Sequence, residues 1–232
     1  MAETTELVLV RHGQAVDNVE FLVNLTSVCR GLTERGHEQA ELVARRLAAE
    51  MAGPQPFEVL CHSPVRRAAE TAGHIAAALG PDVPVEELAG LRVADHGEHG
   101  RHPWDPETNL IGTIPPLHPF SAPSPGAESW QAYLDRSGEA LREIAERHAG
   151  RRILVVAHSE TAAAAVHTFM RLPPGASRWT FPHISHTGLS GWRHAVSPLH
   201  LAEPAGVWTL PYSNDDSHLP DAERAWHLPP PS

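Results

Sequence analysis

The sequence predicts an α/β protein, a three-layer α/β/α sandwich whose central sheet is mainly parallel. Three short apolar runs, at residues 7–10, 57–61 and 152–157, lack the polar alternation of a half-exposed strand and so indicate strands buried on both faces. A stretch with apolar residues at helical spacing follows each run. Alternating strands and helices imply a parallel sheet with right-handed crossovers and helices on both faces.

The two helices of the N-terminal half have recognisable starts and stops. Thr33 is a predicted N-cap, and apolar residues recur at helical spacing until Gly53 and Pro54. After the second apolar run, Ser63 is a predicted cap with Pro64 in the first turn, and this helix is expected to end at Gly80.

The C-terminal half predicts two more helices and several strands. One helix is expected over residues 127–148, and an Ala-rich helix is expected to follow residues 152–157 and to end near Met170. Strand-like stretches at 179–184, 189–192 and 207–212 follow, and the chain closes in a Pro-rich tail that we expect to be loosely held.

We expect a single domain over residues 1–232, interrupted by an insertion at about 82–126. This segment is rich in Pro, Gly and His and is too long for an ordinary connection, so we interpret it as a lid over a site. Its apolar residues, such as Trp104 and Phe120, fit either a partly hydrophobic substrate or packing of the insertion onto the domain.

Composition excludes several classes of partner. The formal charge is −10 and all 18 basic residues are Arg, so we expect no nucleic acid and no membrane as partner. The acidic start lacks the features of a signal peptide, and Cys29 and Cys61 make no disulfide framework, so we expect a cytoplasmic protein. The oligomeric state stays open.

Two of the 17 histidines stand where a parallel sheet places reactive groups. Arg11 and His12 directly follow the first apolar run, and His158 directly follows the third. In such sheets, ligands bind beyond the carboxyl ends of the strands. Gly13 allows close approach of the backbone to a ligand.

The other histidines favour plainer interpretations. His96, His99 and His102 are spaced as helical metal ligands, but nearby Gly and Pro argue against a helix, so we expect a solvated or substrate-binding loop and no metal site. His183 and His186 would lie on opposite faces of a strand, and His148 and His194 are expected at the surface.

Several blocks together resemble the histidine phosphatase superfamily, which contains cofactor-dependent phosphoglycerate mutase and broad-specificity phosphatases. They are the run from Leu7 to Gln14 with Asn18, Gly31-Leu32-Thr33 with Gly36 and Gln39-Ala40, Ser63 to Ala68 with Thr71-Ala72, Pro125-Gly126 with Glu128-Ser129, and Val155 to His158. The likeness spans nearly the whole chain.

The resemblance implies a division of labour. His12 would be the nucleophile that forms a phosphohistidine, and Arg11, Arg67 and His158 would surround the phosphoryl oxygens. Nearby arginines favour the neutral imidazole, which alone has a lone pair for attack. Arg66 is expected to be exposed. Asn18 either touches phosphate or stabilises its own turn.

The chain departs from the family pattern at the general acid. With Gly97 aligned to the family's glycine, Val93 occupies the position of the usual Glu and cannot donate a proton. We hypothesise that Asp95 or Glu98 replaces it. Ser159, in place of a family Gly, is expected to cap the following helix and is a candidate phosphate donor; Glu160 is expected to point away from the phosphate.

These residues predict a metal-independent phosphohydrolase without a cofactor, acting on a small-molecule phosphomonoester. Two alternatives stay open. The departure at Val93 is also consistent with a non-hydrolytic member of the fold that binds an anion or performs other acid/base chemistry. A phosphomutase needs the missing acid and must exclude water, which makes it the weaker alternative.

Overall fold

The computed structural model describes residues 4–20, 29–99, 118–176, 182–196 and 206–223, and its centre is one six-stranded sheet. The strands lie in the order β3-β2-β4-β1-β5-β6. The first four in this order are parallel to one another. Strand β5 runs antiparallel to β1, and β6 runs antiparallel to β5. The bounds are β1 (Thr5–Arg11), β2 (Val59–His62), β3 (Val85–Glu87), β4 (Arg152–Ala157), β5 (Leu189–Ala195) and β6 (Val207–Asp215).

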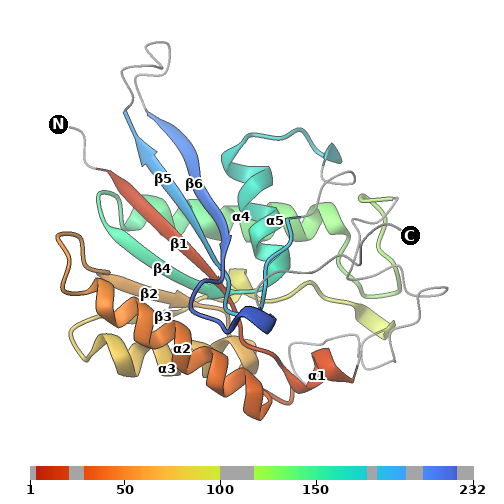
Figure 1. Cartoon of the computed structure of the whole chain (residues 1–232). Helices are drawn as coiled ribbons and strands as arrows, with labels where there is room; N and C mark the ends of the chain where they lie inside the picture. The colour runs from red at the N-terminus through yellow and green to blue at the C-terminus, as the bar shows by residue number, and fades with distance from the viewer. Residues whose placement is uncertain (1–3, 21–28, 100–117, 177–181, 197–205, 224–232) are drawn as a thin grey trace, which may run out of the picture.

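Helices cover both faces of the sheet, which confirms the three-layer prediction. Figure 1 shows α2 and α3 on one face and α4 and α5 on the other. The bounds are α1 (Val16–Val19), α2 (Glu34–Glu50), α3 (Arg66–Leu79), α4 (Trp130–Arg147) and α5 (Ser159–Phe169), with single 3-10 turns at Ala89–Leu91, Gly97–His99 and Asp221–Glu223.

The apolar runs divide their side chains between two cores because successive residues of a strand point to opposite faces. In β1, Val8 and Val10 pack with α2 and α3, whereas Leu7 and Leu9 pack with α4 and α5. All four are at most 5% exposed. This double burial is why the run is continuously apolar, and it fixes the sheet that carries the site.

One predicted N-cap is confirmed and two are wrong. Thr33 caps α2 by accepting from the N–H of Gly36, but α3 begins at Arg66 with Val65 as its N-cap. Ser63 precedes a proline, which disfavours helical backbone, and its hydroxyl serves the site instead. His158 is the N-cap of α5, so Ser159 is its first helical residue and not its cap.

The predicted insertion is partly described. Its start contributes the edge strand β3, which the sequence did not predict, and residues 118–126 form turns before α4. Residues 100–117, including Trp104, lie outside the described residues, as do 177–181 and the Pro-rich tail. The described residues 182–184 do not form the predicted strand. Among the described helices, none combines the length and the apolar character that crossing a membrane requires.

Candidate active site

The pairing of β1 with β4 brings the two predicted histidines together. The strands are parallel, with Arg11 opposite Ala157, so His12 and His158 leave the same edge of the sheet. The N–H of His12 donates to the carbonyl of Ala157, and the two imidazole rings lie 5.3 Å apart, edge to face. The structure therefore places both side chains at the carboxyl ends of the strands, as the sequence predicted.

Hydrogen bonds fix which nitrogen of His12 carries the proton. Its Nδ1 lies 2.7 Å from the carbonyl oxygen of Gly13, which can only accept, so Nδ1 is the N–H. Its Nε2 accepts from Nε of Arg67 at 2.9 Å. The ring is thus neutral, with the Nε2 lone pair aimed into the cluster, which is the tautomer a nucleophile needs.

Arg67 binds both histidines from the first turn of α3. Besides His12, its Nη2 lies 3.3 Å from Nδ1 of His158, and its Nη1 donates to Sγ of Cys29 at 3.4 Å. The residue is 2% exposed. Its neighbour Arg66 points outward and pairs with Glu70, as expected. One step along the helix therefore separates a site arginine from a surface arginine.

Arg11 supplies a second cation, on a half-buried side chain. Its Nη1 donates to the carbonyl of Ile184, and its Nη2 lies 3.1 Å from Nε2 of His186, while its Nε is buried without a hydrogen-bond partner. Burial lowers the pKa of Arg11 to about 10, Glu160 partly opposes this, and Arg67 adds to it. A guanidinium held in this way is poised to gain an anion.

The site histidines are held neutral. Burial, followed by the charges of Arg67, His158 and Arg11, holds the pKa of His12 well below its usual range. Burial and the same two arginines lower the pKa of His158 and of His186 in the same direction. The cluster thus combines two cations with neutral rings in a protein of net charge −10.

Ser63 orients His158 from the end of β2. Its hydroxyl lies 2.9 Å from Nε2 of His158 and also accepts from the N–H of Val65. Since Nδ1 of His158 faces a guanidinium donor, Nε2 carries the proton and donates to Ser63. This link explains why the serine does not serve as a helix cap.

The two other predicted phosphate contacts lie at the margins of this cluster. Asn18 accepts from the N–H of Ala15 and so closes its own turn, and the same oxygen lies 3.2 Å from Nε2 of His186. Ser159 donates its hydroxyl to Glu160. Glu160 itself is half-buried; burial lowers the pKa of Arg11 and of His96, and the charge of Glu160 partly opposes this shift in both.

The region of the missing acid is apolar at its centre. Val93 is 1% exposed and packs against Cys29 and Val65. Asp95 is exposed and accepts from the N–H of Gly97, and Glu98 is exposed. The structure gives neither carboxylate a contact with His12, and their role stays a prediction.

His186 is the site residue that the sequence analysis missed. Its ring lies 5.9 Å from that of His12, and it contacts Arg11 as well. The loop before β5 carries it, and because β5 is antiparallel to β1, this loop lies beyond the carboxyl end of β1. An antiparallel assignment of β5 would have been the signal; the spacing to His183 gave none. His102, considered as a metal ligand, lies outside the described residues.

Known proteins share this architecture. The sequence model of the histidine phosphatase superfamily (branch 1) matches residues 7–197. The chain is 29% identical over 226 residues to a metal-independent phosphoserine phosphatase of Arabidopsis thaliana, covering 94% of this chain and 84% of that protein. It is 32% identical over 225 residues to phosphoglycerate mutase-like protein 4 of the same plant, covering 92% and 86%.

Among solved structures, a phosphoserine phosphatase mutant from Entamoeba histolytica, in complex with phosphoserine, superposes with a TM-score of 0.70. It is 21% identical and covers 93% of this chain and all of the other. At that identity the likeness establishes the fold alone, while the match over residues 7–197 establishes the family. With its histidine pair at the carboxyl edge of the sheet, this chain belongs to branch 1 of the histidine phosphatase superfamily.

Proposed function

We propose that this protein is a phosphohydrolase that cleaves a small-molecule phosphomonoester through a phosphohistidine formed on His12. The observation that carries the proposal is the neutral imidazole of His12, in the tautomer that leaves Nε2 free to attack, beside the buried guanidinium of Arg67 and the half-buried one of Arg11. The family relationship supports a phosphatase, and the named relatives act on phosphoserine or resemble phosphoglycerate mutase.

The proposed reaction begins when the phosphoryl group displaces the contact between Arg67 and Nε2 of His12. Nε2 attacks phosphorus, the bond to the leaving oxygen breaks, and the negative charge on the phosphoryl oxygens meets the N–H groups of Arg11 and Arg67. The carbonyl of Gly13 stabilises the positive charge that develops on the His12 ring. Water then attacks phosphorus and releases phosphate and the free imidazole.

Two arguments favour neutral His12 as the resting state. Protonation would place a third positive charge beside the guanidinium groups of Arg67 and Arg11, and burial together with these charges lowers the pKa of His12. Only the neutral ring has a lone pair for attack on phosphorus, while the two arginines bind the anionic substrate.

The proton for the leaving oxygen remains the open role, and we propose Asp95 or Glu98 for it. Their loop lies within the proposed lid and joins the described fold through an antiparallel bridge between His96 and Ala127. Glu160 is the competitor because its charge is felt by Arg11 from the start of α5. An aryl phosphate needs little protonation of its leaving group, whereas an alkyl phosphate needs much, so the ratio of the two rates identifies the acid.

The experiment on the acid compares the double variant Asp95→Asn/Glu98→Gln with Glu160→Gln. We expect the double variant to lose alkyl phosphatase activity and the basic limb of its pH profile while it keeps aryl phosphatase activity. If the double variant leaves both unchanged, the proposed acid is wrong, and a selective loss in Glu160→Gln would assign the proton to that residue.

The single-domain organisation, the lid at about 82–126 and the cytoplasmic location are part of the proposal. The described cysteines, Cys29 and Cys61, are both free and buried, as expected in a reducing compartment. We also propose direct phosphate contacts from Asn18, Ser159 and His158. The acidic net charge supports a small metabolite and not nucleic acid or a membrane surface as partner.

Phosphate release across a panel of phosphoserine, sugar, acyl, nucleotide and aryl phosphates tests the function. We expect release from at least one class, and a loss of more than a hundredfold in His12→Ala. Absence of release from every class, with binding of phosphate retained, would instead support the non-hydrolytic alternative. Transfer of the phosphoryl group to an added hydroxyl acceptor, with slow release, would support the mutase alternative.

A further inference from the structure

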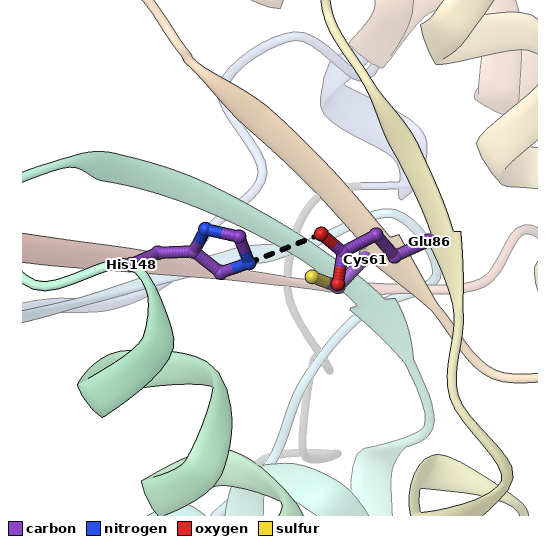
Figure 2. Close-up of side chains that lie close together, drawn as sticks. All are labelled: Cys61, Glu86 and His148. Carbon is purple, nitrogen blue, oxygen red and sulfur yellow. Dashed lines mark ion pairs between the residues drawn. The ribbon is translucent and has the colours of Figure 1, made fainter.

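A cluster of three potential metal ligands lies on the α4 side of the sheet and uses none of the residues around His12. Figure 2 shows the side chains of Cys61, Glu86 and His148 converging from β2, β3 and the C-terminal end of α4. Their thiol, carboxylate and imidazole ligand atoms lie within 4.8 Å of one another. These residues are far apart in sequence, so no motif marks them.

The cluster is built into the protein interior. Cys61 is fully buried in the core between the sheet and α4, and His148 is 7% exposed, whereas the sequence placed His148 at the surface. The Nε2 atom of His148 is buried without a hydrogen bond of good geometry, although it lies 3.2 Å from Oε1 of Glu86. A buried nitrogen held in this way calls for a partner in the same direction.

We propose that Cys61, Glu86 and His148 bind one zinc-like divalent cation that links β2, β3 and α4. Thiolate, imidazole and carboxylate are the ligand types of tetrahedral zinc sites. Bond lengths of about 2.0–2.3 Å place the ligands of such a site roughly 3.5 Å apart, so no separation between ligand atoms has to close by more than about 1.3 Å. A water molecule from the solvent side of half-buried Glu86 completes the coordination.

The surrounding charges fit this assignment. Arg147 donates from Nη1 to Oε2 of Glu86 at 2.8 Å, which fixes the carboxylate and leaves Oε1 directed at His148. A ligating carboxylate is commonly oriented by such a second hydrogen bond. As the metal–sulfur bond forms, the thiol proton passes to solvent, and thiolate plus carboxylate then balance the charge of the divalent ion.

The site is structural and separate from the proposed hydrolysis, which uses no metal. Its effect is to tie the edge strand β3, only three residues long, to the centre of the fold. We therefore expect the ion to raise thermal stability and to leave phosphate release nearly unchanged.

The test titrates chelator-treated full-length protein with Co²⁺, which reports thiolate ligation through a sulfur-to-cobalt charge-transfer band. We expect one Co²⁺ per chain with that band and tetrahedral visible bands, displacement by one Zn²⁺, and a rise in Tm on adding Zn²⁺. Cys61→Ser should abolish the band, and His148→Gln should weaken binding at least tenfold.

Matched controls separate this site from chance binding by a His-rich chain. Cys29→Ser removes the other cysteine, and His37→Gln removes one member of the His37–His74 contact, a close pair of imidazoles outside the active site. Both should keep the band and the stoichiometry. Far-UV circular dichroism confirms that each variant folds, and Glu86→Gln serves as a second variant if Cys61→Ser does not.

Absence of the charge-transfer band in the wild type, or a band that survives Cys61→Ser, would overturn the proposal. A band lost equally in Cys29→Ser would also overturn it. With any of these three results, the cluster is only an ion pair between His148 and Glu86 beside a buried thiol.

Discussion

Replacing Arg67 by Met removes the guanidinium that contacts both His12 and His158 while keeping much of its bulk. Arg67 donates to His12 at 2.9 Å and lies 3.3 Å from His158, and it is 2% exposed. Loss of one preorganised donor to a transition-state oxyanion costs about 10²–10³ in kcat, or about 2.7–4 kcal/mol. We expect a loss of this size in Arg67→Met.

The same variant should also move the acidic limb of the pH profile. The charge of Arg67 is, after burial, the largest cause of the lowered pKa of His12. Without it the pKa of His12 rises, so the ring becomes protonated and inactive at a higher pH than in the wild type. The acidic limb of kcat/KM therefore shifts toward neutral pH in Arg67→Met.

The assay measures hydrolysis of an aryl phosphate from pH 4.5 to 8, because this substrate needs little help from a general acid. Arg66→Met is the matched control: its side chain is 63% exposed and pairs only with Glu70 among the described contacts, so its activity should stay within about twofold. A kcat within tenfold of the wild type in Arg67→Met, or an acidic limb that does not move to higher pH, would contradict the roles assigned to Arg67.

Three further predictions concern stability and orientation. The site histidines have lowered pKa values when folded, so the unfolded state binds more protons below about pH 6.5 and the free energy of unfolding falls as the pH drops. In urea unfolding, His186→Gln should reduce the slope of this free energy against pH by up to about 1.4 kcal/mol per pH unit. An unchanged slope would contradict the lowered pKa of His186. Gly36→Ala places a Cβ 2.0 Å from the carbonyl oxygen of Gln14 and should destabilise the protein by about 1–3 kcal/mol. The matched variant Gly73→Ala adds its Cβ in open space on α3 and should stabilise the protein by roughly 0.5–1 kcal/mol. Equal effects of the two variants in thermal unfolding would contradict the close approach of Gly36 to Gln14. Ser63→Ala removes the hydrogen-bond partner of His158 and should lower kcat at least about tenfold, which corresponds to about 1.4 kcal/mol, with little change in KM. Ser63→Thr keeps the hydroxyl and should recover the activity. A change in KM alone would contradict a positioning role for Ser63.

The elements that the sequence predicted well are those whose local signals agree with the fold. The run from Leu7 to Val10 is apolar at every residue because both of its faces are covered, and the Thr33 cap works through a contact within one turn. The carboxyl ends of parallel strands meet at one edge of a sheet, so the sequence alone predicts that His12 and His158 lie together.

The parts that the sequence missed depend on long-range contacts. His186 reaches the site because β5 runs antiparallel to β1, and its three-residue spacing from His183 carries no trace of that pairing. Ser63 has the local signature of a helix cap, but its hydroxyl is used by His158 across the sheet. His148 has the sequence context of a surface residue at a helix end, but the fold buries it beside Glu86 and Cys61.

The proposed mechanism requires His12 to carry the phosphoryl group during turnover. Rapid acid-free quenching of the enzyme with a ³²P-labelled substrate from the active class, followed by peptide mapping, detects this intermediate. We expect an acid-labile, base-stable phosphoryl group on the peptide containing His12, formed as fast as turnover and absent in His12→Ala. Turnover without a labelled enzyme, a label on another residue, or undiminished turnover in His12→Ala would contradict it.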